Sequence, residues 1–170
     1  MKRNRRKNLA KAGLAAAAFI ASATIALPTF ATPGSGFTPS PQPVGVLPPA
    51  HFNADKADKW DLFLKSKNSS TVGVDIIAVS AGGQSGWHTH TGMTLVTVTS
   101  GELQWYDGED PICAFKTYRA GDSFIEPNNH VHLVRNPTAS PASFVAVQVR
   151  PEGTGPRIDE PTKPTNCPAF

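Results

Sequence analysis

The amino-acid sequence predicts an all-β domain, folded as a sandwich or a small barrel. Short runs of β-branched and aromatic residues recur through the central part of the chain, and turn-forming residues separate them about every eight to twelve residues. No segment after the N-terminal region has a convincing helical pattern. We expect one domain, because the length that remains after that region suits a single core.

The first 31 residues have the layout of a secretory signal peptide. Residues 1–11 contain six basic residues and no acidic one, residues 14–27 are apolar and rich in Ala, and Thr29-Phe30-Ala31 offers small residues for a signal peptidase. We expect cleavage after Ala31 and a secreted, extracytoplasmic protein. The apolar run is shorter than the roughly 20 residues that a membrane span requires. We therefore read it as part of the signal, and we expect no stable membrane span after cleavage. Arg5-Arg6 leaves a twin-Arg export route open beside ordinary secretion.

Removal of this segment reverses the sign of the net charge. The full chain has 16 basic and 13 acidic residues, and six of the basic ones lie in residues 1–11, so the mature chain has ten basic residues against 13 and a formal charge of −3. The basic isoelectric point is therefore a property of the signal. No basic patch interleaved with aromatic residues remains, so we expect no nucleic-acid partner.

Two proline-rich segments flank the predicted domain, which spans residues 51–150. Residues 32–50 are rich in Pro, Gly and Ser and predict a flexible or extended leader. Residues 151–170 predict an extended tail that contains Cys167. The other cysteine is Cys113, and an even cysteine count in an exported chain favours a disulfide over two free thiols. Such a bond would tie the tail to the domain.

Turn signals divide the predicted domain into short strands. The expected strands are residues 59–67, 72–79, a strand opened by His88, 93–99, 103–106, 115–118, 131–134 and 144–149. For the first of these, a short helix from Ala54 is the alternative. Gly82-Gly83 is expected to break the chain after the second strand.

Two histidine motifs indicate a metal site. His88-Thr89-His90 places two imidazoles on one face of an extended strand, because side chains alternate along a strand. A second stretch, from Pro127 to Asn136, contains His130 and His132. Imidazole is a suitable ligand for Zn, Cu, Fe and Ni. Two surface histidines would explain one such pair, but two pairs in a chain with five histidines favour a site.

The spacing resembles the two motifs of the cupin superfamily. The matching positions are Gly82, His88, His90 and Gly101 in the first motif, and Gly121, Pro127, His132 and Asn136 in the second. The resemblance implies a jelly-roll barrel, also called a double-stranded β-helix, with one cupin domain. The chain departs from the family at Thr94, where a metal-binding Glu is usual, and at Asn129, where Gly is usual. Asn tolerates the left-handed conformation better than most residues, so the second change is mild.

The resemblance implies that His88, His90 and His132 bind a divalent transition metal, which is Fe, Zn, Mn, Ni or Cu. With Thr94 in place of Glu, we expect three neutral imidazoles, an open coordination position and the full +2 charge of the ion. Such a site favours an anionic substrate group. Thr94 shares its strand face with the histidines, and it either hydrogen-bonds a metal-bound water or fills space in the barrel.

The sequence suggests roles for three further residues near the motifs, with two alternatives for His130 and for Trp87. His130 shares strand parity with His132, so it is a candidate catalytic proton donor or a replacement fourth ligand; a loop histidine beside the barrel mouth is the alternative. Trp87 either stacks on a substrate at the rim or packs in the core. Asn136 is expected to shape the turn after its strand.

Three classes of function fit these observations. The first is a metal-dependent enzyme that acts on a small molecule, as a three-His dioxygenase or isomerase does. The second is a non-catalytic module that binds a small molecule or a carbohydrate, and the third is a structural domain with a vestigial site. The expected partner is a small-molecule ligand or substrate, and a homodimer is kept as a candidate assembly. Nucleophile-elbow, phosphate-loop and dinucleotide motifs are absent from the sequence.

Overall fold

The computed structural model describes residues 34–54 and 61–170. The predicted signal peptide therefore lies outside the described residues, as does most of the segment for which a short helix was the alternative. Within the described residues there are strands and no helices, so the predicted all-β class is confirmed. In this part of the chain no helix has the length and apolar character needed to cross a membrane.

The strands follow one another in short steps. In chain order they are β1 Ser35–Pro41, β2 Gly45–Leu47, β3 His51–Asn53, β4 Phe63–Lys65, β5 Ser70–Gln84, β6 His88–Thr89, β7 Met93–Ser100, β8 Glu102–Asp107, β9 Phe115–Arg119, β10 Ser123–Glu126, β11 His132–Arg135, β12 Ala142–Pro151 and β13 Ile158–Asp159.

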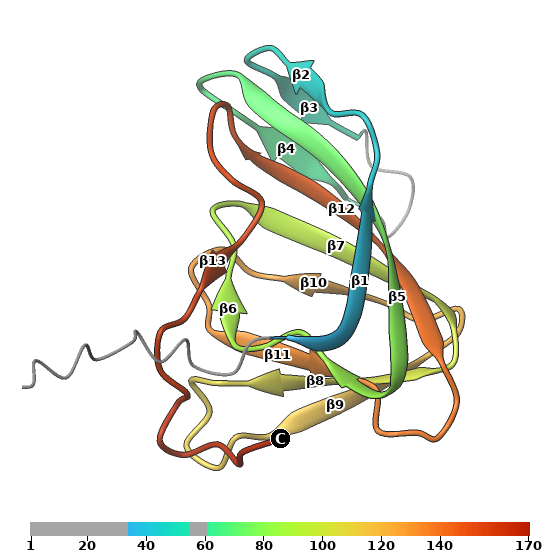
Figure 1. Ribbon diagram of the computed structural model, residues 1–170. Coiled ribbons are helices and arrows are strands. Elements are labelled where there is room, and N and C mark those ends of the chain that lie inside the picture. Colours follow the sequence, from blue (N-terminus) through green and yellow to red (C-terminus); the bar gives the residue numbers. More distant parts are fainter. Residues whose placement is uncertain (1–33, 55–60) are drawn as a thin grey trace, which may run out of the picture.

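Two antiparallel layers form a nearly closed jelly-roll barrel (Figure 1). One layer has the order β10-β7-β12-β5, with β1 and β2 on the other edge of β5, and the second contains β9, β8, β11, β6 and β13. The layers join where Arg135 of β11 pairs with Gln84 of β5. A separate hairpin of β3 and β4 lies at one end.

The alternation of side chains places the core inside the barrel. On β7, Thr94, Val96 and Val98 are buried, whereas Met93 and Leu95 on the opposite face are exposed, because side chains alternate along a strand. The buried residues of the main core are Ile77, Val79, Val96, Val98, Leu103, Trp105, Phe124, Val134, Ala142, Phe144 and Ala146. They form an apolar floor below the polar layer that contains Thr94.

The predicted leader contributes to the sheet. Residues 37–41 of β1 pair with residues 75–79 of β5, and Phe37 contacts Phe144 across the interior. Its described residues are extended, and the barrel sheet begins at Ser35, before residue 51, where the domain was expected to start. Pro39 and Pro41 are tolerated because β1 is an edge strand, where the missing N–H groups are not needed by a second neighbour.

The expected break after Val79 is a bulge and not the end of a strand. β5 continues through Gly82 and Gly83 to Gln84, and the register with β1 shifts between Ser35 and Phe37. Gly82 has φ 69°, a left-handed conformation that glycine adopts without strain. This bend brings the end of β5 to β11 and so joins the two layers.

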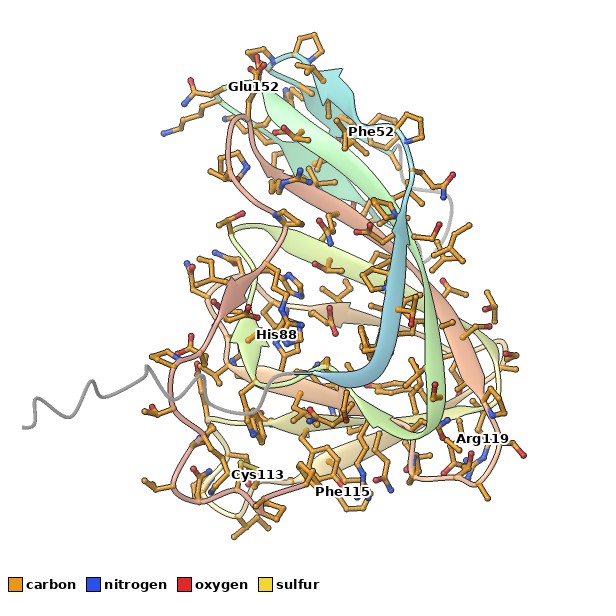
Figure 2. All side chains as sticks on the ribbon, in the orientation of Figure 1. Phe52, His88, Cys113, Phe115, Arg119 and Glu152 are labelled. Carbon is orange, nitrogen blue, oxygen red and sulfur yellow. A yellow bond between two sulfur atoms is a disulfide. The ribbon has the colours of Figure 1, made fainter. Side chains whose placement is uncertain are left out.

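The C-terminal tail is fastened to the barrel at two points. β13 pairs with β6, and a disulfide joins Cys113 to Cys167, as predicted (Figure 2 labels Cys113). Trp87, Tyr106 and Leu133 form a second buried cluster with the two cysteines. The tail is therefore part of the packed structure.

Candidate metal centre

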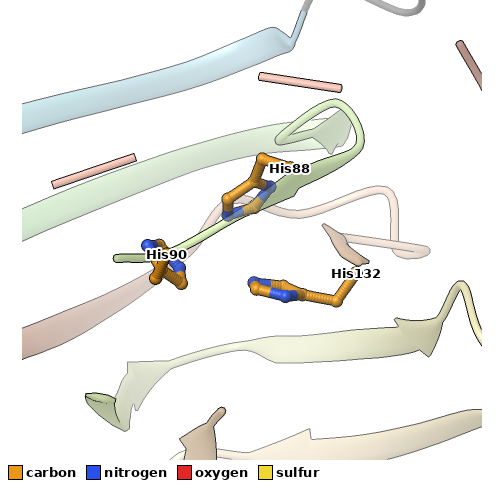
Figure 3. Close-up of side chains that lie close together, drawn as sticks. All are labelled: His88, His90 and His132. Atoms are coloured by element: carbon orange, nitrogen blue, oxygen red, sulfur yellow. The ribbon is translucent and has the colours of Figure 1, made fainter. Parts of the chain in front are cut away.

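Three histidines converge inside the barrel. His88 of β6 and His132 of β11 are register partners on adjacent strands, and His90 follows directly after β6. Their rings face one another (Figure 3), with centroid separations of 4.3 Å for His88–His132, 4.9 Å for His88–His90 and 5.1 Å for His90–His132. One ring nitrogen from each histidine lies within 4.8 Å of the other two. The structure thus brings together the three residues that the sequence proposed as ligands.

The backbone fixes which nitrogen each ring presents. Nδ1 lies 2.9 Å from the Gly86 carbonyl in His88, 2.7 Å from the Pro156 carbonyl in His90 and 2.8 Å from the His130 carbonyl in His132. A carbonyl oxygen only accepts hydrogen bonds, so each Nδ1 carries the proton and donates it. In the neutral ring Nε2 is then a lone pair, which is the form that binds a metal ion. Nε2 of His90 also lies within hydrogen-bond distance of Oε2 of Glu126.

Glu126 adds a carboxylate that was not predicted from the sequence. It lies on β10 opposite Thr94 of β7, and it is 4% exposed. Its Oε2 is 3.0 Å from Nε2 of His90, and its Oε1 is 3.4 Å from Nε2 of His132. The three histidines form the group of candidate ligands that the sequence proposed, and this carboxylate from the neighbouring strand lies beside two of them. The alternation of Phe124 and Glu126 on the inner face of β10, directly before Pro127, was the available signal.

The buried environment favours the charge states that attract a cation. Burial alone raises the pKa of Glu126, but the electrostatic attraction of His132 and His90 outweighs it and holds this pKa well below its ordinary value. Burial, followed by repulsion from His132, lowers the pKa of His88 well below its ordinary value. The carboxylate is thus ionised and the His88 ring neutral near pH 7.

Two buried atoms at this position lack a partner in the described part of the chain. Nε2 of His132 and Oγ1 of Thr94 make no hydrogen bond there. Unpaired buried polar atoms are costly, and they are explained when an ion or a water lies between them. Three imidazole nitrogens with a carboxylate beside them are a suitable environment for a divalent transition metal. The residues present therefore fit the metal that the resemblance implied.

A cavity of about 300 Å³ opens beside the histidines. Its walls come from β1, β5, β12 and the C-terminal tail as well as from the site itself. The lining residues are Phe37, Pro39, Pro41, Asp75, Ile77, His88, His90, Thr94, Glu126, Val134, Phe144, Ala146, Gln148, Pro156 and Arg157. The wall is largely apolar, with polar groups concentrated at the histidines and at a few further points.

Arg157 is the one Lys or Arg among the described residues that line this cavity. Its Nη2 donates to the Ser85 carbonyl at 2.7 Å, and its Nε pairs with Asp159. These two contacts hold the guanidinium in place near His88, whose pKa it also lowers. Sequence reasoning missed this residue because the tail carries no motif.

His130 does not lie at the site. Its Nε2 is 2.8 Å from Oδ1 of Asp107 and its Nδ1 is 3.2 Å from Oε2 of Glu109, both on the β8 side of the barrel. The parity argument fails because β11 begins at His132, so His130 belongs to the preceding loop. It is therefore neither a replacement ligand nor a proton donor in the cavity; the loop alternative agrees with this position.

The remaining motif residues have structural roles. Trp87 is 1% exposed in the second core cluster, so it packs and does not form a rim. Asn129 has φ 54°, as expected for a residue at the usual Gly position. The Asn136 amide donates to the carbonyls of Val79, Ser80 and Ser140, which shapes the turn after β11.

A comparison with protein-family models agrees with this architecture. A family model described as "Cupin domain" matches residues 76–148. No curated protein matches the chain.

Three solved structures illustrate the structural similarity. A cupin-like protein from Thermotoga maritima has a TM-score of 0.46 at 21% identity, over 52% of this chain and 64% of that one. A cupin domain from Bordetella pertussis has a TM-score of 0.41 at 23% identity, over 62% and 99%. A sugar phosphate isomerase from a cupin superfamily, from Silicibacter pomeroyi, has a TM-score of 0.41 at 29% identity, over 46% and 50%. The chain spans about half to two thirds of the first structures it matches.

Proposed function

The chain belongs to the cupin superfamily, and from this premise we propose that it is a metal-dependent enzyme that acts on a small anionic molecule in the barrel cavity. One observation carries the proposal: three buried histidines, each with Nδ1 held by a backbone carbonyl, place one ring nitrogen each within 4.8 Å of the other two, beside the cavity. Fe, Mn, Zn, Ni and Cu are all compatible with this donor set.

A divalent ion bound there would polarise a substrate oxygen as a Lewis acid. The surrounding residues position the substrate and exclude water from the cavity. Phe37, Ile77 and Phe144 line the cavity with apolar surface, which excludes water and strengthens electrostatic interactions inside. A cavity of about 300 Å³ lies at the small end of ligand sites, so a small molecule is the expected substrate.

Arg157 supports the anionic class of substrate. Its guanidinium is held by the Ser85 carbonyl and by Asp159, so little side-chain entropy is lost when it binds a carboxylate or a phosphate. The charged fork can pair with such a group in two parallel hydrogen bonds. We propose that Arg157 orients the anionic end of the substrate toward the histidines.

Export remains part of the proposal. The signal-like segment of residues 1–31 and the Cys113–Cys167 disulfide both support a mature protein outside the cytoplasm, where disulfides persist.

The test is a substrate screen on the mature protein after reconstitution with each metal in turn. Small carboxylates and sugar phosphates are incubated with and without oxygen, and products are followed by NMR and oxygen consumption. We expect turnover with one metal, abolished by chelation, and a higher KM with a smaller change in kcat for Arg157→Gln. Binding without turnover would instead favour the non-catalytic module, and no binding of any anion would contradict both.

A further inference from the structure

Thr94 and Glu126 are opposite one another on adjacent strands. They are register partners on β7 and β10, both side chains point inward, and their exposed fractions are 1% and 4%. Opposite residues in an antiparallel pair have Cβ atoms about 4.5–5.5 Å apart. A carboxylate on either strand can therefore reach the same region of the barrel interior.

The distances from Glu126 to two of the three histidines are compatible with neighbouring ligands of one ion. Ligand atoms about 2.0–2.2 Å from a metal lie about 3.0–3.5 Å from one another at adjacent positions. The observed separations of 3.0 Å to Nε2 of His90 and 3.4 Å to Nε2 of His132 fall in this range. Without an ion, the contact between Nε2 of His90 and Oε2 of Glu126 is a hydrogen bond, and a bound cation would take the place of the proton between these two atoms.

We propose that Glu126 is the fourth protein ligand of the metal, so that β10 provides the carboxylate that residue 94 of β7 lacks. This inference rests on the metal site of the proposed function and goes beyond its three histidines. Thr94 is small enough to leave room for the Glu126 side chain, and its Oγ1 has no partner within the described residues. The carboxylate neutralises one unit of the metal's charge, and its hard oxygen favours Mn and Fe relative to a site with histidines alone.

Glu126→Gln tests this assignment with little change in shape. Metal affinity is measured by anaerobic titration with Mn(II), and the coordination of bound Cu(II) is followed by EPR. We expect Mn(II) affinity to fall by about tenfold or more. The Cu(II) spectrum should move to a higher g∥ and a smaller A∥, because an anionic oxygen has left the coordination shell. Circular dichroism establishes that the variant is folded.

Two further variants complete the experiment. The exchange Thr94→Glu/Glu126→Thr returns the carboxylate to β7 and should recover most of the lost Mn(II) affinity. Glu109→Gln is the matched control, because this acid pairs with His130 and is half exposed; both its Mn(II) affinity and its Cu(II) spectrum should equal those of wild type.

The outcomes distinguish loss of the metal site as a whole from loss of Glu126 as a ligand. If wild type binds no metal, the proposed function fails and the inference with it. If wild type binds metal and Glu126→Gln binds it equally well, only the inference is overturned. A weakened affinity with an unchanged Cu(II) spectrum also overturns it, since Glu126 would then act from outside the coordination shell.

Discussion

At the level of single residues, the site depends on which ring nitrogen of each histidine carries the proton. Backbone carbonyls of Gly86, Pro156 and His130 accept from the three Nδ1 atoms and so leave Nε2 as the nitrogen that can bind a metal ion. Two of these carbonyls lie two residues before the histidine they orient, on the same segment. The local chain path therefore sets the tautomer of His88 and His132, and the C-terminal tail sets that of His90.

We predict that His132→Ala abolishes stoichiometric metal binding. The change removes one of three Nε2 ligands and leaves the barrel folded, because the ring belongs to the polar layer above the apolar floor. His130→Ala is the matched control, since that ring pairs with Asp107 and Glu109 away from the cavity. Metal content per chain after dialysis measures both. Equal content in the two variants would contradict the ligand assignment.

Part of the site was predictable from the sequence at this scale and part was not. The His-x-His spacing identified His88 and His90, and the second motif identified His132, because strand alternation and a fixed turn determine where they point. Glu126 and Arg157 were not predicted, because tertiary contacts, and not a local sequence motif, bring each of them to the site. Glu126 comes from the strand beside Thr94, and Arg157 from a tail without a regular pattern.

At the level of elements, the C-terminal tail completes the site. It supplies the Pro156 carbonyl that holds His90, the Arg157 side chain that lines the cavity and the β13 strand that pairs with β6. The Cys113–Cys167 disulfide, which closes a separation of 54 residues, fastens this tail to the barrel. In the chain-entropy model such a bond contributes about 4 kcal/mol to the free energy of unfolding.

We predict that Cys113→Ser/Cys167→Ser lowers metal affinity as well as stability. Without the bond the tail detaches more often, and His90 loses the acceptor that orients its ring, so affinity should fall by about tenfold or more. Anaerobic titration and thermal unfolding measure the two effects. Val98→Ala is the control, because it weakens the apolar floor without touching the tail. A double variant that loses stability but keeps wild-type affinity would show that the tail does not support the site.

The strands themselves differed in how well the sequence predicted them. β7 and β12 have strong β-branched patterns, and their positions were predicted because a half-buried strand requires that alternation. β1 has prolines and little apolar alternation, so its pairing with β5 was not visible. The break expected at Gly82-Gly83 is a bulge, since a glycine pair fits a bend within a strand as well as its end.

At the level of the whole molecule, the barrel is closed by the segments at both ends of the described chain. β1 covers one edge of β5, and the tail crosses beside β6 on the other layer (Figure 1). Both segments line the cavity, so some of the residues that form its wall lie outside residues 76–148, which the family model matches. The fold class followed from the strand and turn pattern, but this closure required tertiary contacts that short-range patterns do not encode. Export and a homodimer stay predictions.

The most direct test of the metal centre is the metal content of the mature protein purified without chelators, followed by anaerobic titration of the stripped protein. The account predicts one divalent transition metal ion per chain, removed by a chelator and restored by titration to the same stoichiometry. Selective ¹⁵N labelling of histidine should then alter the pulsed EPR spectrum of the Cu(II)-loaded protein, because imidazole nitrogens are bound. A protein that is folded, purified without metal and unable to bind any divalent ion at stoichiometric level would contradict the account.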